Sequence, residues 1–230
     1  MIDLHSHILP GMDDGSKSVK MSIEMLRRSA CQGVAVIAAT PHFYPMRSTP
    51  ELFLQQRQEA VHRLGQLPED VPQVILGAEV AYFDGISRSQ ELLDLQLGNT
   101  GLLLVEMPFC NWTSRMIEEL RELESNLGLT PVLAHIDRYQ RKRQYPKYSD
   151  LLEEYGVLLQ CNCESFRGFF SRRRMLKLLS QGKIHFLGSD CHDLDTRPPN
   201  MRSAAKVIGQ KLGSQTMDSL TQRSKTLLGL

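Results

Sequence analysis

Apolar residues occur along the chain in two patterns that alternate from the N-terminus onward. Short, nearly continuous apolar runs are typical of strands buried on both faces, and longer segments with apolar residues every three or four positions are typical of amphipathic helices. The predicted strands are the N-terminal run and residues 34–40, 74–80, 102–106, 130–134, 157–163 and 184–188. The predicted helices are about residues 16–33, 50–67, 87–95, 114–126, 149–155, 171–181 and 201–212, followed by a helical tail. This alternation predicts a parallel sheet covered by helices.

The seven predicted strands follow one another without a low-complexity linker, which favours a single domain over residues 1–230. The fold class that we predict is α/β, a distorted (β/α)7 TIM-like barrel with parallel strands. An open doubly wound sheet is the alternative that the periodicity also allows.

Composition sets limits on the kind of protein. With 41% hydrophobic and 23% charged residues and a net charge of +1, the chain is globular, and its balanced charge gives no support for a nucleic-acid partner or an anionic membrane surface. No apolar run approaches the ~18 residues of a membrane-spanning helix, and none resembles a signal peptide. Five cysteines are an odd number in a chain too large to need disulfides, so we expect reduced thiols in a cytoplasmic protein without membrane insertion.

Residues that bind metals follow the predicted strands at one end. His5 and His7 are two positions apart, so on an extended chain they face the same side. Further candidates stand at or just past the ends of later strands, namely His42, Glu79, Glu106, His135, Asp190 and His192. In a parallel barrel these ends meet at one mouth, which carries the active site. Histidines and acids delivered to one rim by six strands predict a metal centre.

The number and type of these candidates indicate the chemistry. Eight or nine nitrogen and oxygen ligands are too many for one ion and suit two or three ions that share bridging carboxylates. Clustered divalent ions are typical of phosphoryl hydrolysis, and the lack of a thiolate favours Mn²⁺, Fe²⁺, Zn²⁺ or Co²⁺. His62 and His185 do not fit the pattern, and Asp3 and Asp13 are expected to support hydrogen bonds.

Basic residues near the candidate ligands suit a phosphorylated substrate. Arg138 lies three residues past His135, and Arg197 lies just past His192. Guanidinium groups bind phosphate through two hydrogen bonds, so we expect these two arginines to hold the phosphate. The run Arg141, Lys142 and Arg143 is expected to be a solvated loop, whereas Arg172, Arg173 and Arg174 open a helix either as surface charge or as a partner patch.

Seven short motifs run through the chain in a fixed order. They are His5-Ser6-His7, Asp13-Asp14-Gly15, Thr40-Pro41-His42, Gly77-Ala78-Glu79, Glu106-Met107-Pro108, His135-Ile136-Asp137-Arg138-Tyr139 and Gly188-Ser189-Asp190-Cys191-His192. As an ordered set they resemble the PHP (polymerase and histidinol phosphatase) superfamily. More closely, the chain is similar, from residue 1 to about Arg197, to the bacterial protein-tyrosine phosphatases found with capsule and exopolysaccharide synthesis genes.

The resemblance implies a distorted barrel of the PHP fold, a trinuclear and often Mn²⁺-dependent centre, and a tyrosine-rich kinase tail as substrate. Carried over by position, one ion would take His5, His7, Glu79 and Asp190, a second would share Glu79 and take Glu106 and His135, and a third would take Asp14, His42 and His192. Arg138 and Arg197 match the phosphate-binding arginines of the family. Cys191 stands where the family usually has a residue such as Ala or Met, and we expect its thiol to face away from the ligands.

We therefore expect a metal-dependent protein-tyrosine phosphatase that acts on a bacterial tyrosine kinase controlling capsule or exopolysaccharide synthesis. In this mechanism a hydroxide that bridges two ions attacks phosphorus, and the phenolate leaves. One alternative is a phosphoesterase of the same superfamily acting on a small metabolite, such as histidinol phosphate, or on a nucleotide ester. Another is a non-catalytic metal-binding regulator of a kinase complex.

A cysteine-based tyrosine phosphatase is rejected on the sequence. The Cys-x5-Arg spacing of those enzymes occurs at residues 161–167 and 191–197. Such a loop wraps backbone N–H groups around the phosphate at a helix N-terminus. The second loop places two carboxylates where the dianion would lie, and the first contains Glu164 and no glycine.

Overall fold

The structure is a computed structural model and describes residues 1–141 and 144–230. Its strands are β1 (Ile2–Ser6), β2 (Val36–Ala39), β3 (His42–Phe43), β4 (Gln73–Leu76), β5 (Glu79–Ala81), β6 (Leu102–Glu106), β7 (Thr130–Leu133), β8 (Leu158–Asn162) and β9 (Phe186–Gly188). Its helices are α1 (Val19–Cys31), α2 (Pro50–Leu64), α3 (Ser114–Leu127), α4 (Ile136–Arg141), α5 (Gln144–Glu154), α6 (Phe169–Ser180), α7 (Met201–Leu212) and α8 (Gln215–Leu228). Short 3₁₀ segments are η1 (Ile86–Arg88), η2 (Gln90–Asp94) and η3 (Cys163–Phe166).

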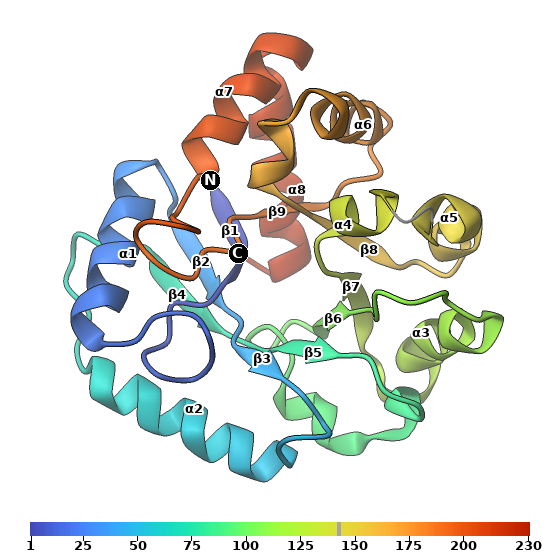
Figure 1. The fold of residues 1–230 in the computed structure, drawn as a ribbon, viewed down its shortest axis with the longest axis horizontal. Coiled ribbons are helices and arrows are strands. Elements are labelled where there is room, and N and C mark those ends of the chain that lie inside the picture. The colour runs from blue at the N-terminus through green and yellow to red at the C-terminus, as the bar shows by residue number, and fades with distance from the viewer. Residues whose placement is uncertain (142–143) are drawn as a thin grey trace.

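The strands form two parallel sheets that are joined into one ring. The sheet orders are β1-β2-β4 and β3-β5-β6-β7-β8-β9, and every pairing between the described strands is parallel. The segment after β9 connects to β1, because Asp190 N–H donates to the His5 carbonyl at 2.7 Å and His7 N–H donates to the Cys191 carbonyl at 2.9 Å. The strands lie at the centre of the molecule and α1, α2, α3, α5, α6 and α7 surround them (Figure 1). This confirms the predicted parallel α/β barrel.

Two of the predicted strands differ from the structure in how they end or continue. The predicted strand 34–40 holds β2 and ends at Thr40-Pro41, as expected, because proline has no N–H group with which to continue the ladder; the short strand β3 follows past its end. Residues 74–80 form β4 and β5, and between them a Cβ on Gly77 would lie 2.6 Å from the side chain of Leu97. The pieces still pair as neighbours, since Glu79 N–H donates to the Pro41 carbonyl at 3.0 Å.

Several helix boundaries differ from the prediction. Ser18, not Ser16, caps α1, accepting from Met21 N–H at 3.2 Å. The predicted helix over 87–95 consists of the 3₁₀ segments η1 and η2, and the helix predicted at 149–155 begins earlier, at Gln144. Arg141, which we expected in a loop, ends α4, and the other members of that basic run, Lys142 and Arg143, lie outside the described residues.

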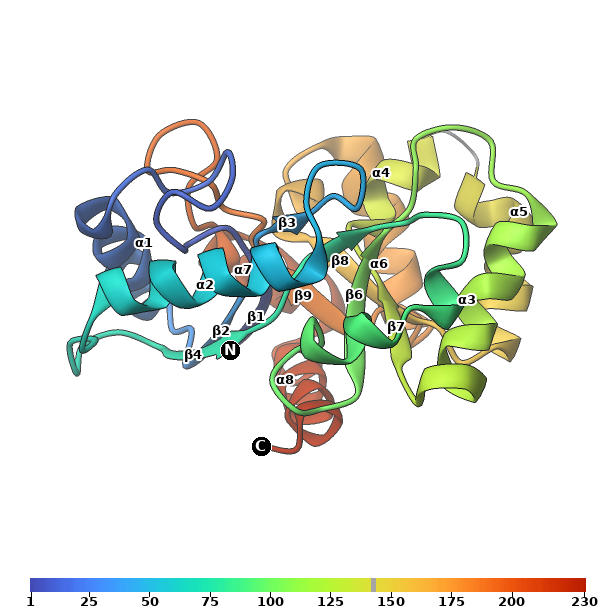
Figure 2. The same cartoon turned by 90° about the horizontal axis from the view of Figure 1, so that it is seen from below.

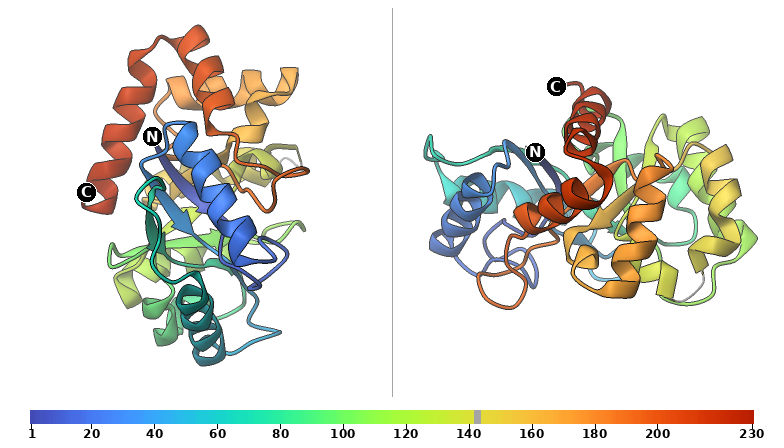
Figure 3. Two further views of the ribbon diagram at one scale, coloured as in Figure 1. Left: turned by 90° about the vertical axis from the view of Figure 1, so that its left-hand side faces the viewer. Right: turned by 90° about the horizontal axis from the view of Figure 1, so that it is seen from above.

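Two hydrophobic clusters hold the barrel together. The larger one lies between strands and surrounding helices. The smaller one combines alternate residues of several strands, including Leu4, Ala38 and Leu104, with Leu228 of α8, as expected for side chains that point into a barrel. Figures 2 and 3 show α8 on the opposite side of the strands from the loops that follow β1 and β9. Among the described residues no helix is long and apolar enough to cross a membrane.

Candidate metal centre

Every residue predicted as a ligand lies at or near the carboxyl ends of the strands. β1 carries His5 and the loop after it His7 and Asp14, whereas β3, β5 and β6 carry His42, Glu79 and Glu106, and His135, Asp190 and His192 directly follow β7 and β9. His5, His7, Glu79, His135, Asp190 and His192 are buried. So many buried histidines and acids are costly unless charges are paired or a metal is bound.

Four of these side chains point their donor atoms at one position. His5 Nε2 lies 3.1 Å from His7 Nε2 and 3.1 Å from Glu79 Oε2. Asp190 Oδ1 lies 3.7 Å from His5 Nε2 and 3.5 Å from His7 Nε2. Ligands bound to one ion at about 2.0–2.2 Å lie roughly 3–3.5 Å apart, so these four side chains have the spacing of a metal site.

Glu79 connects this group to a second one. Its Oε2 faces His5 and His7, whereas its Oε1 lies 3.0 Å from His135 Nε2. Glu106 Oε1 lies 3.1 Å from the same nitrogen. The two oxygens of Glu79 therefore have the placement of a carboxylate shared by two ions.

A third group lies toward the loop after β1. The donor atoms of His7, Asp14, His42 and His192 all lie within 4.8 Å of one another, and Asp14 Oδ1 is 3.4 Å from His192 Nε2. The groups overlap, because His42 Nδ1 also lies 2.9 Å from Glu79 Oε2. The structure thus brings the whole candidate set together, with His7 and His42 each close to two groups.

Further polar residues hold the histidines in place. Asp13 Oδ2 accepts from His7 Nδ1 at 2.7 Å and from His42 N–H at 2.9 Å. Gln160 Oε1 lies 3.2 Å from His5 Nδ1 and accepts from His135 N–H at 2.6 Å. Such partners fix the tautomer and orientation of a ligating imidazole. The hydrogen bonds expected of Asp13 are thus present.

Asp3 also supports the centre. Its Oδ1 accepts from Ser189 N–H at 2.8 Å, across the junction between β1 and the segment that carries Asp190. Gln160 and Asn162 were missed in the sequence, although two polar residues at alternate positions of an otherwise apolar strand were a usable signal. Asn162 Nδ2 donates to Asp190 Oδ2 at 2.7 Å.

The backbone is strained at two candidate ligands. His135 and Asp190 have φ angles of 34° and 52°, which are uncommon for residues with a Cβ and cluster at functional sites. Close packing accompanies the strain at β9, where a Cβ on Gly188 would lie 2.5 Å from Gln160 Nε2 and 2.6 Å from His5 Cβ. A side chain at that position would press against His5 and Gln160, so their close approach depends on this glycine.

The electric field of the site favours positive charge. Burial lowers the pKa of His7, but its hydrogen bonds to Asp13 and Glu79 outweigh burial and raise the pKa to about 10. Burial also lowers the pKa of His135, but its hydrogen bonds to Glu106 and Glu79 outweigh burial and raise that pKa to about 9. His42 Nδ1 and His192 Nε2 are buried and make no well-oriented hydrogen bond with the described residues, although Glu79 Oε2 and Asp14 Oδ1 lie 2.9 Å and 3.4 Å from them. Buried imidazole nitrogens that face carboxylates without forming a hydrogen bond fit a bound divalent cation.

The two candidate phosphate-binding arginines lie at the rim of the centre. Arg138 Nη2 and Arg197 Nη2 both contact Asp190 Oδ2, the latter at 2.7 Å, and their side chains are 35% and 37% exposed. Asp190 thus directs one oxygen toward the histidines and the other toward the arginines. A pocket of about 500 Å³ opens beside the centre, with Asp14, His42, Tyr44 and Arg47 among its walls.

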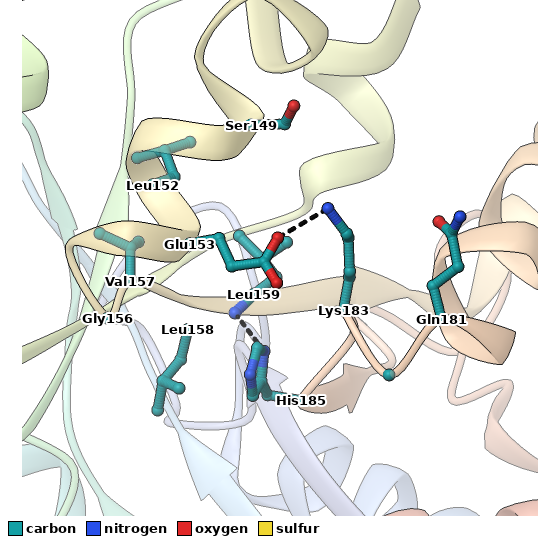
Figure 4. A pocket seen from close by; sticks show the side chains of 11 residues that line it. Ser149, Leu152, Glu153, Gly156, Val157, Leu158, Leu159, Gln181, Lys183 and His185 are labelled. Carbon is teal, nitrogen blue, oxygen red and sulfur yellow. Dashed lines mark hydrogen bonds and ion pairs between the residues drawn. The ribbon is translucent and has the colours of Figure 1, made fainter.

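The residues rejected as functional lie elsewhere or are chemically inert. Burial raises the pKa of the Cys161, Cys163 and Cys191 thiols, so none is a thiolate nucleophile. His185 Nδ1 accepts from Leu159 N–H at 3.1 Å, and its side chain lines a cavity of about 130 Å³ (Figure 4). This cavity lies near the start of β8, at the other end of the strand from the mouth. His62 is exposed on α2.

Fold and site together define a parallel α/β barrel with a candidate metal centre at the carboxyl ends of its strands. The chain belongs to the family described as capsular polysaccharide synthesis, CpsB/CapC, whose family model matches residues 1–228.

Similar proteins carry related names. The tyrosine-protein phosphatase YwqE of Bacillus subtilis (strain 168) is 32% identical over 235 residues, which cover 99% of this chain and 91% of YwqE. The tyrosine-protein phosphatase CpsB of Streptococcus pneumoniae is 32% identical over 233 residues, covering 96% and 94%. A crystal structure from work on these two proteins, described as metal-dependent tyrosine phosphatases, matches with a TM-score of 0.82 at 31% identity and covers 100% of this chain and 94% of that one. Dihydropyrimidinase from Brevibacillus agri, at 12% identity and a TM-score of 0.61 over 98% of this chain and 70% of its own, shares the fold alone.

Proposed function

We propose that this protein is a metal-dependent protein-tyrosine phosphatase of capsule or exopolysaccharide synthesis. The observation that carries the proposal is the placement of Glu79, whose two oxygens face two groups of histidines in a family with members named tyrosine-protein phosphatases. We extend the proposal to the whole span 1–230 as one phosphatase domain, acting in the cytoplasm on a phosphotyrosine-bearing bacterial tyrosine kinase.

The donor set fits two or three divalent ions, with Mn²⁺ as the expected ion. We assign His5, His7, Glu79 and Asp190 to one ion, Glu79, Glu106 and His135 to a second, and Asp14, His42 and His192 to a third. When bound, such ions neutralise the charge of the phosphate and activate water for its hydrolysis. The buried carboxylates and histidines would hold the ions and keep bulk water away from them.

The arginines bind and orient the phosphate. Arg138 and Arg197 approach the centre from its solvent-exposed rim. Asp190, to which Asn162 donates a hydrogen bond, pairs with both guanidinium groups next to the ligands. A planar guanidinium donates two parallel hydrogen bonds to phosphate oxygens, which aligns phosphorus with the centre. A tyrosine phenol has a pKa of about 10, so it leaves more readily than an alkyl alcohol.

A substrate panel tests this function. We expect Mn²⁺-stimulated turnover of a phosphotyrosine peptide, loss of turnover with a chelator, and little turnover of histidinol phosphate or a 3′-5′ dinucleotide. The matched controls Cys161→Ser and Cys191→Ser should retain activity. Turnover that persists after metal removal, or a preference for either of the other substrates, would replace the proposed function with one of its alternatives.

A further inference from the structure

The first turn of α6 exposes two aromatic side chains. Phe169 and Phe170 are 65% and 76% exposed, and their rings meet edge to face with centroids 5.4 Å apart. Aromatic side chains of this size left in water at adjacent positions are characteristic of binding surfaces, where aromatic residues and arginine are enriched.

The same helix is strongly basic. α6 carries Arg172, Arg173, Arg174 and Lys177 and no acidic residue, although the net charge of the whole chain is only +1. The acid on the preceding turn, Glu164, is already paired with Arg167 at 3.1 Å. The positive end of the helix dipole lies at the same turn as the two phenylalanines. This surface therefore attracts negative charge.

A cavity lies beside this surface, between α6 and α4. It measures about 300 Å³, and its walls include Asp137, Phe169, Phe170 and Arg174. Asp137 immediately precedes Arg138 in α4, and its Oδ1 accepts from Asn162 N–H at 2.9 Å. Asn162 and Arg138 both contact Asp190, so the cavity lies beside the candidate phosphate-binding residues.

We propose that Phe169, Phe170, Arg173 and Arg174 form a docking surface for an acidic segment of the polypeptide that carries the phosphotyrosine. This rests on the proposed function and adds a preference for substrates with acidic residues near the phosphotyrosine. The arginines attract the acidic side chains, and the cavity beside the two phenylalanines accepts an apolar side chain of the same segment. A concave site next to the centre suits a chain passing from the mouth to α6, whereas a membrane surface would contact only the exposed rings.

The test compares Arg173→Glu/Arg174→Glu with the wild-type protein on three substrates: a small aryl phosphate, a phosphotyrosine peptide with acidic flanks, and the same peptide with neutral flanks. We expect kcat/KM for the acidic peptide to fall about tenfold through a higher KM, and the other two substrates to change less than about twofold. Phe169→Ser/Phe170→Ser should raise KM for both peptides and leave the aryl phosphate unchanged. Lys206→Glu/Lys211→Glu on α7 makes the same charge change and should leave all three substrates unchanged.

Other outcomes would overturn the docking proposal. An unchanged KM for the acidic peptide would remove it, and so would equal losses on all three substrates, which would indicate damage to the centre. Loss of binding to phosphatidylglycerol vesicles with unchanged peptide kinetics would assign the surface to a membrane instead. Wild-type protein that turns over none of the three substrates would contradict the proposed function itself.

Discussion

Glu79 is the single residue on which the candidate centre depends most. It is 1% exposed, and its two oxygens serve two different groups of histidines. The neighbouring histidines outweigh burial and hold the pKa of its carboxyl well below the usual range, so the carboxylate is charged. A residue in this position determines both the charge and the spacing of the centre.

The variant Glu79→Gln preserves the size of the side chain and removes its charge. We expect kcat for a phosphotyrosine peptide to fall at least ~100-fold and the bound metal per chain to drop, because an amide is a poor bridging ligand. Elemental analysis and steady-state kinetics measure the two effects. Glu59→Gln on the exposed face of α2 is the control. Full activity with normal metal content in Glu79→Gln would mean that the centre is built differently.

Asp13 tests the residues that position the ligands. Replacing it with Asn weakens the hydrogen bond to His7 and removes a negative charge from the pocket. We expect metal affinity to fall about 10- to 100-fold, while activity returns at saturating metal. Titration of activity against Mn²⁺ gives the apparent affinity. Asp70→Asn, at an exposed ion pair with Arg27, should leave that titration unchanged, and an unshifted curve in the Asp13 variant would deny its supporting role.

The lowered pKa of His185 makes the free energy of unfolding depend on pH. Burial, followed by the charge of Arg223, lowers its pKa to about 4, whereas its value in an unfolded chain is about 6.5. The unfolded chain therefore binds the proton more tightly, and the contribution of His185 to stability is lost as the pH falls from about 6.5 to about 4.

The variant His185→Asn keeps an acceptor for Leu159 N–H and does not titrate. Between about pH 7 and pH 4.5, it should lose less unfolding free energy than the wild type, by on the order of 2 kcal/mol. Urea unfolding at both pH values measures the difference, with His62→Asn on the exposed face of α2 as control. Parallel pH profiles for His185→Asn and the wild type would contradict the assignment.

At the scale of elements, β9 combines a strand end with a close contact. Gly188→Ala places a methyl group against His5 and Gln160, and we expect a loss of about 1–3 kcal/mol in unfolding free energy together with reduced activity. Gly209→Ala in α7 is the matched control, because the nearest atom beyond its own helical turn, Ser214 Cα, is 4.0 Å from the added Cβ, and it should stabilise the protein by about 0.4–1 kcal/mol. Denaturant unfolding of both variants measures the effect. A Gly188→Ala variant as stable as the wild type would show that β9 can move to admit the methyl group.

The elements also show where sequence reasoning succeeds. The strands around Leu104 and Val132 were predictable because both faces are buried, which leaves continuous apolar runs. The end of β2 at Thr40-Pro41 was predictable from the proline, whereas β3 was not, because a strand of two residues is too short to show a pattern. The apolar spacing of η1 and η2 predicts a helix, because at this length a 3₁₀ segment and an α-helix have similar spacing.

The same contrast holds for the site. The strand-end histidines and acids were predictable from position alone, since parallel topology collects strand ends. For Gln160 the sequence marks only an unusual polar position in an apolar strand, because its partners, the His5 side chain and the His135 N–H group, come from distant parts of the chain. The sharing of His7 and His42 between groups likewise depends on distances that no linear pattern contains.

At the scale of the whole molecule, the buried acids connect stability to metal. Glu79 and Asp190 are buried carboxylates whose negative charge a bound divalent cation would neutralise. We expect a chelator to lower the melting temperature and Mn²⁺ to restore it in a concentration-dependent way. Thermal unfolding monitored by circular dichroism measures this. The response should vanish in Glu79→Gln, and an identical melting temperature with and without metal would contradict the linkage.

The ring is completed where β1 meets the segment after β9, and Asp3 bonds to Ser189 across 186 positions of sequence. During synthesis on a ribosome, His5 and His7 emerge well before Asp190 and His192. A nascent chain therefore cannot hold an ion with its full set of ligands until the segment after β9 has been made. Metal capture by the full set is thereby reserved for chains that extend past β9, and a translation product interrupted before that point would be released without a working centre.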